Sequence, residues 1–301
     1  MKNSTNPDTH LFSILTFIPF LIITFGLTWG IIALYIFLPE FMAVTFGELT
    51  GEHPLFYLAT YGPAVAALVI VLFKTRLSGI KQFLSRLLMW RAPAIWYIFL
   101  IFIVPVPFYV GAAVKGLPMA EMFPVSTLGS YIVTLFMFAI KGPIEEIGWR
   151  GFALPLLQRK MSPLWAGLII GVIWGFWHLP AFLLSGTPQS AWSFSDFFVG
   201  TIALSIIATA LYNVSRGSIL LPMLFHLQVI NPLWPDAQPY DTIPFVIVAT
   251  LVVWLNRKTM FDRNSGMTNI LLPKKSKGDE IEDVKTKSQI SRPKIATPTE
   301  K

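Results

Sequence analysis

Eight long apolar stretches divide this chain, and they restrict its fold more than any other feature of the sequence. They cover residues 11–38, 54–73, 94–114, 125–141, 163–184, 195–214, 217–234 and 242–256. A helix needs about 20 mostly apolar residues to cross the hydrocarbon core of a bilayer. Because backbone polar groups in lipid must be hydrogen-bonded internally, such segments are helical. The sequence therefore predicts an all-α polytopic membrane bundle of about eight transmembrane helices.

The loops between these stretches alternate in charge. Basic residues follow the second, fourth, sixth and eighth stretches, at Lys74, Arg76, Lys81, Arg86, Arg91, Arg150, Arg159, Lys160, Arg216, Arg257, Lys258 and Arg263. The loops after the other four stretches are acidic, nearly neutral or uncharged. Because cytoplasmic loops carry the excess of Lys and Arg, this alternation predicts that both termini are cytoplasmic.

The composition of the chain restricts its partners and its chemistry. Only 13% of the residues are charged and the mean hydropathy is +0.63, as is typical of membrane proteins. The net charge of +7 comes from short basic patches beside apolar stretches, which favours contact with anionic membrane lipids and not with nucleic acid. The absence of cysteine excludes disulfides, thiolate zinc sites and a cysteine nucleophile.

The sequence divides into two parts by composition. Residues 1–262 form the predicted transmembrane domain, and residues 263–301, rich in charged residues, Ser, Thr and Pro, form a predicted disordered cytoplasmic tail. The first apolar stretch is too long for a signal peptide and no small-residue cleavage site follows it, so we interpret it as a retained helix. This organisation is typical of a multi-pass protein of a bacterial plasma membrane, with the endoplasmic reticulum as the alternative.

Two carboxylates and a guanidinium lie within apolar sequence in GPIEEIGWRGF, residues 142–152. Ionisable groups at membrane depth are costly and usually serve a function. On a helix Glu146 and Arg150 are four residues apart and share a face, where they can form an ion pair. Glu145 is rotated by about 100° from Glu146 and remains free to act as a general base. The alternative is an ordinary salt bridge at the membrane interface.

Two histidines lie in other apolar stretches. His178 follows Trp174 by four residues, so the indole can line the pocket of the imidazole, and His226 lies within LPMLFHLQVINP. One such histidine is commonly a buried hydrogen-bonding residue, but two histidines and a carboxylate from three segments could hold a catalytic water or a metal ion. Glycines in the stretch of His178 recur every four residues and predict close packing against another helix, at Gly167, Gly171 and Gly175.

Together these residues resemble a known family. EEIGWR resembles the EExxxR motif of the CAAX-protease and bacteriocin-processing (CPBP or Abi) family of intramembrane endopeptidases. WGFWH is similar to the second motif of that family, FxxxH, and His226 corresponds to the histidine of the third, HxxxN. The resemblance covers about residues 125–235, the family core, with the motifs in the expected order.

The resemblance implies a peptide hydrolase that acts on a membrane-associated or lipidated protein or peptide. Glu145 would activate the attacking water with help from His178, while His226 and an asparagine would stabilise the oxyanion. Glu146 and Arg150 would hold the site together. The family was long described as metalloproteases, but the mechanism requires no cofactor; a zinc ion, if bound, would have Glu145, His178 and His226 as ligands.

The sequence departs from the family motifs at two positions. Trp174 stands where the family usually has Phe, and Ile230 occupies the position four residues after His226, with the asparagine one later at Asn231. On a regular helix Asn231 would be turned about 100° from His226. Because Pro232 disfavours helical geometry at the preceding residue, we expect the chain to open there and Asn231 to turn back toward the site.

Glu145 and His178 must lie at a similar depth in the membrane if they belong to one site. If the fourth helix ended near residue 141, Glu145 would lie at the membrane edge, while His178 is about fifteen residues into the next helix. At 1.5 Å per residue this separates them in depth by about 22 Å. We therefore expect the segment from Pro143 to about Gln158 to fold back into the membrane as its own helix.

Two other functions use the same residues. A non-catalytic membrane immunity or interaction protein could keep the family scaffold, and the shifted asparagine favours it. A proton-coupled transporter could use the same carboxylates, but it would be indicated by inverted repeats with paired broken helices, which the sequence does not display.

Overall fold

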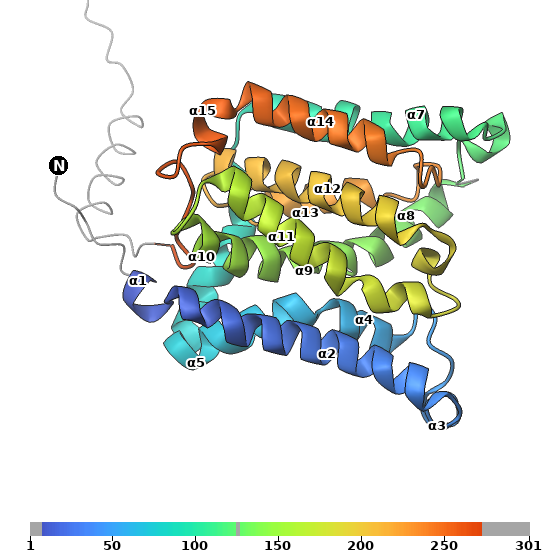
Figure 1. Cartoon of the computed structure of the whole chain (residues 1–301), viewed down its shortest axis with the longest axis horizontal. Helices are drawn as coiled ribbons and strands as arrows, with labels where there is room; N and C mark the ends of the chain where they lie inside the picture. Colours follow the sequence, from blue (N-terminus) through green and yellow to red (C-terminus); the bar gives the residue numbers. More distant parts are fainter. Residues whose placement is uncertain (1–7, 125–126, 273–301) are drawn as a thin grey trace, which may run out of the picture. The chain divides into compact units, whose positions relative to one another are not determined.

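The computed structural model describes residues 8–124 and 127–272, and the regular secondary structure of these residues is entirely helical (Figure 1). The α-helices are α1 (Asp8–Leu11), α2 (Phe17–Phe37), α3 (Pro39–Phe46), α4 (Pro54–Thr60), α5 (Gly62–Leu84), α6 (Ala94–Ile98), α7 (Val106–Lys115), α8 (Leu128–Ala139), α9 (Glu145–Gly148), α10 (Leu154–Gln158), α11 (Pro163–Trp177), α12 (Phe194–Val214), α13 (Leu220–Val229), α14 (Thr242–Leu255) and α15 (Arg257–Met260). The predicted all-α membrane bundle is confirmed.

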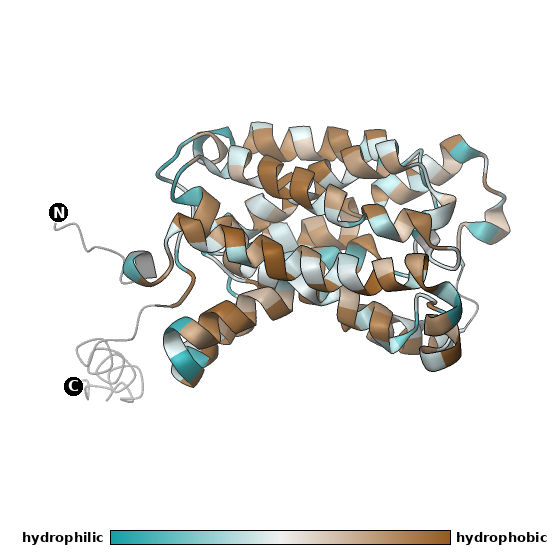
Figure 2. Cartoon of the chain, turned by 60° about the horizontal axis from the view of Figure 1, so that its bottom comes forward, coloured by the Kyte–Doolittle hydropathy of each residue, from teal (hydrophilic) through white to brown (hydrophobic). Residues whose placement is uncertain are grey.

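Six helical segments of the described residues are long and apolar enough to cross a membrane. They are Ile14–Phe37, Gly62–Leu88, Ala94–Lys115, Leu128–Gln158, Pro163–Leu183 and Phe194–Val214. Two shorter apolar helices, α13 and α14, correspond to the last two predicted stretches. In Figure 2 hydrophobic residues follow the lengths of the helices, and hydrophilic ones gather toward their ends and in the loops.

The segment that carries the EEIGWR motif differs from the prediction. Leu128–Gln158 forms one helical segment of 31 residues, in which α8, α9 and α10 follow one another in the same direction (Figure 1). It is broken at Lys141 (φ −100°, ψ −91°), immediately before a short 3₁₀ turn at Gly142–Ile144. The expected helix that folds back from Pro143 is therefore wrong. Gly142–Pro143 interrupts the hydrogen bonding of the helix without reversing the chain, so Glu145 lies within this long segment and not at its edge.

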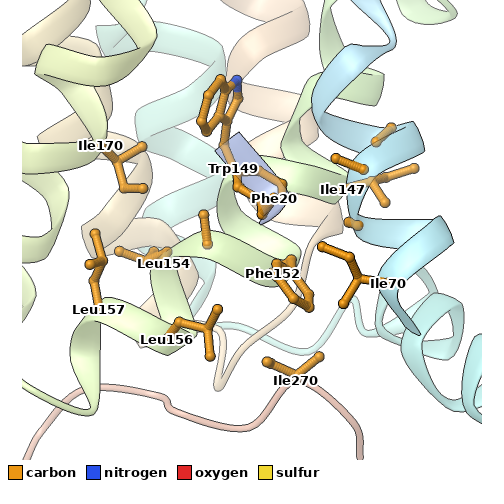
Figure 3. Packing of buried hydrophobic residues seen from close by; sticks show 14 of the residues in the cluster. Phe20, Ile70, Ile147, Trp149, Phe152, Leu154, Leu156, Leu157, Ile170 and Ile270 are labelled. Atoms are coloured by element: carbon orange, nitrogen blue, oxygen red, sulfur yellow. The ribbon is translucent and has the colours of Figure 1, made fainter. Parts of the chain in front are cut away.

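The segment after the break is held in a buried apolar core. Its fully buried residues include Trp149, Phe152 and Leu156. Figure 3 shows them packed with residues from α2, α5, α11 and the C-terminal segment, among them Phe20, Ile70, Ile170 and Ile270. This packing fixes the helical segment that carries both glutamates.

The glycine face of α11 packs against α12. A Cβ atom built at Gly171 would lie 2.8 Å from the Cα of Ile202, and one at Gly167 would lie 2.6 Å from the hydroxyl of Thr209. At Gly175 the contact is with the ring of Phe198, at 2.5 Å. The glycines thus let α12 approach α11, as their spacing predicts.

The start of the predicted tail also differs from the sequence boundary at residue 263. Ile270 and Leu271 are buried, and Ile270 belongs to the core of Figure 3. Backbone carbonyls of this segment accept hydrogen bonds from Arg86 (to Ile270), Gln158 (to Met267) and Arg159 (to Thr268). Residues 263–271 are therefore part of the folded domain, because their apolar side chains and carbonyls have partners that composition does not reveal. Residues 273–301 of the predicted tail lie outside the described residues.

Candidate active site

Glu145 begins α9 and is almost fully buried, at 3% exposure. Its Oε2 accepts a hydrogen bond of 2.8 Å from the indole Nε1 of Trp174 on α11. A carboxylate accepts several hydrogen bonds. The indole therefore fixes Glu145 while leaving it capacity to accept a hydrogen bond from a water.

Glu146 connects two other predicted site residues. Its Oε1 accepts hydrogen bonds from Arg150 Nη1 at 3.0 Å and from His226 Nδ1 at 2.8 Å. Glu146 and Arg150 are 1% and 0% exposed, so the ion pair expected from their spacing is present and fully buried. Because a carboxylate can only accept, Nδ1 of His226 carries a proton and Nε2 is the ring nitrogen left for other partners.

His178 follows the last residue of α11, and its Nδ1 lies 2.8 Å from the backbone carbonyl of Trp174. The carbonyl accepts, so Nδ1 is the donor and Nε2 keeps its lone pair. The imidazole packs between Trp177 and Phe197, with ring centroids 4.7 and 5.0 Å away. These contacts orient the ring, and the free lone pair makes it suitable to accept a proton from a water.

Trp174 contacts four ionisable residues of the site, of which Glu145 is one. Its ring centroid lies 5.5 Å from that of His178 and 5.3 Å from that of His226. The guanidinium carbon of Arg150 lies 4.9 Å from the indole, in cation–π geometry. The sequence predicted only the contact with His178. The hydrogen bond to Glu145 depends on how two helices pack, so no spacing within α11 could reveal it.

A cavity of about 390 Å³ adjoins these residues. Glu145, Trp174, His178 and His226 all contribute to its wall, together with many apolar side chains. Gly142 matters at this wall, because a Cβ atom there would lie 2.8 Å from Nε2 of His226. The Gly-Pro pair therefore does more than interrupt the helix: it also leaves space beside the free nitrogen of His226.

Asn231 also lines the cavity and is buried, but its side chain has other partners. Helix α13 ends at Val229, so the chain opens before Pro232 as expected. The amide Nδ2 of Asn231 donates to Oε1 of Gln228 at 2.9 Å, and its Oδ1 accepts from the backbone of Leu233 at 3.0 Å. Gln228 is thus a neighbour of the site that sequence reasoning missed.

Lys141 lines the cavity and is a further residue that sequence reasoning missed. Its Nζ donates to the backbone carbonyl of Gly51 at 2.6 Å and lies 3.7 Å from the carboxylate of Glu52. Aromatic rings from Phe56, Tyr57 and Phe138 surround the ammonium at 5.1 to 5.9 Å. The only signal in the sequence was a single lysine at the end of an apolar stretch.

The zinc ion that the resemblance allows would need donor atoms of Glu145, His178 and His226 grouped around one point. Hydrogen bonds to protein groups use Nδ1 of each imidazole and Oε2 of Glu145, and they leave Nε2 of both rings for other partners. Within residues 8–124 and 127–272, no three His, Asp or Glu side chains are grouped as metal ligands. We therefore derive no step that uses a metal.

Comparison with known proteins gives two matches to this region. Residues 127–229 match the family model described as type II CAAX prenyl endopeptidase Rce1-like. A CAAX prenyl protease 2 of Methanococcus maripaludis is 27% identical over 177 residues, which cover 55% of this chain and 64% of that relative. Both matches agree with the resemblance that the motifs suggested.

Proposed function

Because residues 127–229 match the type II CAAX prenyl endopeptidase Rce1-like family model, we propose that this chain is an intramembrane endopeptidase with Glu145 as its catalytic carboxylate. Its substrate would be a membrane-associated or lipidated protein or peptide. One observation carries the proposal. Glu145, His178 and His226, which come from three helices, all contact Trp174 and all line one cavity.

The proposed reaction begins with a water held beside Glu145 and His178. The carboxylate of Glu145 accepts a proton as the water oxygen attacks the carbonyl carbon of the peptide bond. His178 accepts a hydrogen bond from the same water through Nε2 and orients it. When the C–N bond breaks, Glu145 returns the proton to the departing amine, so the products are a carboxylic acid and an amine.

The oxyanion that forms during attack needs hydrogen-bond donors. His226 would serve through Nε2, which must then carry a proton in addition to the one that Nδ1 shares with Glu146. Glu146 and Arg150 would act through His226 by fixing its ring. Asn231 would contribute only if its amide left Gln228, so we assign the main part of this role to His226.

The long apolar helices are those of a multi-pass membrane protein, with membrane lipids as partners. We propose the plasma membrane of a bacterium as its location. No cofactor is part of the proposed mechanism.

The decisive experiment compares Glu145→Gln with the wild-type protein and with Glu121→Gln, which changes a surface carboxylate outside the cavity wall. Peptides in the membrane fraction of cells that produce each variant are identified by mass spectrometry. We expect a shortened peptide with the wild type and with Glu121→Gln. Glu145→Gln should reduce it by about 10²–10⁴-fold while amounts of the protease in the membrane stay equal.

Persistence of the product in Glu145→Gln would contradict the proposal. A cellular phenotype that persists in Glu145→Gln without any shortened peptide would instead favour the non-catalytic immunity or interaction protein. The side-chain partners of Asn231 are the observation that favours this second function.

A further inference from the structure

The cavity extends beyond the candidate catalytic residues to a polar wall that the proposed reaction does not use. This wall includes Gln189, from the turn Pro188–Ala191, and Gln238 and Asp241, from the loop between α13 and α14. A hydrogen bond of 3.4 Å from Trp192 to Asp236 connects the two segments. Both segments lie at the end of the bundle where α8 begins (Figure 1).

Three acceptor atoms of this wall are buried without a hydrogen-bond partner among the residues that the structure describes. They are Oε1 of Gln189, Oε1 of Gln238 and Oδ1 of Asp241. Asp241 is only 3% exposed, yet it contributes to the cavity wall. Amide and carboxylate oxygens can only accept, and a buried acceptor without a donor is costly. The wall therefore suits a ligand that brings several N–H donors.

The charge of the wall favours a cation as that ligand. Two carboxylates, those of Asp236 and Asp241, face one ammonium, that of Lys115, which donates to the backbone carbonyl of Asp236 at 2.8 Å. Burial raises the pKa of Asp241 to about 6, so the carboxylate is mostly ionised at pH 7 and lacks a full counter-charge. An ammonium group has three N–H donors, as many as the unpartnered acceptors.

We propose that Gln189, Gln238 and Asp241 form a subsite that binds a positively charged amino group of the substrate. The subsite rests on the proposed function, since it would hold one part of a peptide whose scissile bond lies near Glu145. The amino group belongs either to a lysine side chain or to a free peptide N-terminus. Both sources share the chemistry that the three acceptors select.

Binding of small probes tests the subsite without knowledge of the substrate. The purified full-length protein in detergent is titrated with Nα-acetyl-lysine N-methylamide, with leucine N-methylamide and with the uncharged Nα-acetyl-norleucine N-methylamide. Thermal unfolding at each concentration gives the dissociation constant, because ligand binding to the folded state raises the unfolding temperature. We expect at least one charged probe to bind at least tenfold more tightly than the norleucine probe, and the stronger of the two identifies the source of the amino group.

Substitutions test whether the proposed residues are responsible for binding of the charged probe. Asp241→Asn should weaken the preferred probe about tenfold, as expected for loss of a charge-assisted hydrogen bond. Asp196→Asn removes the same charge from α12, outside the cavity wall, and should leave binding unchanged. If Asp241→Asn does not fold, Gln189→Glu decides instead, because a second carboxylate should tighten binding of the charged probe.

Two results would overturn the subsite. One is equal affinity for the charged and uncharged probes, which would mean that water alone satisfies the acceptors. The other is unchanged affinity in both Asp241→Asn and Gln189→Glu. Probe binding is measured without turnover of any substrate, so failure of the proteolytic function and failure of the subsite give different results.

Discussion

Trp174 donates its indole N–H to Oε2 of Glu145 across 2.8 Å, and so joins α11 to α9 at the candidate base. The usual residue of the family at this position, Phe, fills similar space but has no N–H. This protein therefore holds its glutamate with a hydrogen bond that a phenylalanine cannot make, and the bond is made inside the bundle, where competing water is scarce.

Trp174→Phe tests how much the hydrogen bond from Trp174 to Glu145 contributes to catalysis. The ring contacts with both histidines should be largely kept, while Glu145 loses the indole N–H donor. We expect proteolysis to fall about tenfold, with most of the loss in kcat, because the carboxylate is less well oriented toward the water. An unchanged kcat would show that the indole acts only as a packing residue.

Arg150→Met should destabilise the protein by about 3–5 kcal/mol, because it leaves the carboxylate of Glu146 buried without its guanidinium. The double variant Glu146→Gln with Arg150→Met should recover a large part of this loss, since no unpaired charge remains. Thermal unfolding in detergent measures both. Equal unfolding temperatures for the single and double variants would contradict the importance of the buried ion pair.

Gly171→Ala should lower stability by about 1–3 kcal/mol, because the new Cβ would lie 2.8 Å from the backbone of Ile202 and separate α11 from α12. Gly30→Ala in α2 is the matched control, since a Cβ there meets nothing within 4 Å. The control should be neutral or stabilising, because alanine favours helices. Similar unfolding temperatures for the two variants would argue against close packing at the glycine face.

Ile270→Ala should destabilise the folded domain by about 2–5 kcal/mol, because Ile270 is fully buried in the core around the motif segment. Leu255→Ala, at a position 69% exposed at the end of α14, should have a much smaller effect. Thermal unfolding in the same detergent compares them. If the two variants unfold alike, residues 263–271 do not contribute to the stability of the domain as their contacts indicate.

The orientation in the membrane can be measured cleanly because the chain has no cysteine. Glu48→Cys and Lys160→Cys each introduce one exposed thiol, in loops that the charge pattern assigns to opposite sides. A membrane-impermeant maleimide should label Glu48→Cys in intact cells, and Lys160→Cys only after permeabilisation. The reverse pattern would place the termini outside the cytoplasm.

The sequence predicts the parts of this structure that depend on local spacing. Apolar stretches predict the helices, the i, i+4 spacing predicts the Glu146–Arg150 pair, and the glycines predict the contact of α11 with α12. It does not predict that Leu128–Gln158 continues through the break at Lys141. A Gly-Pro pair signals an interruption but carries no information on whether the chain then continues or reverses.

The site itself depends on contacts between distant segments, and there the sequence is a weaker guide. Composition places Ile270 in a tail because residues 263–301 as a whole are rich in charged residues, Ser, Thr and Pro, although the side chain of Ile270 is buried in a core. Spacing relates Asn231 to His226, but Gln228 and Leu233 hold the asparagine instead. In each case the decisive partner is chosen by tertiary packing.

The contacts of residues 267–270 with Arg86, Gln158 and Arg159 have a consequence for biosynthesis. Because these residues follow the last long helix, they leave the ribosome after every membrane helix has entered the translocation machinery. The segment that carries both glutamates therefore gains these contacts last. A nascent chain whose residues 267–270 are still inside the ribosome lacks them, so the candidate site is completed only after this segment has emerged.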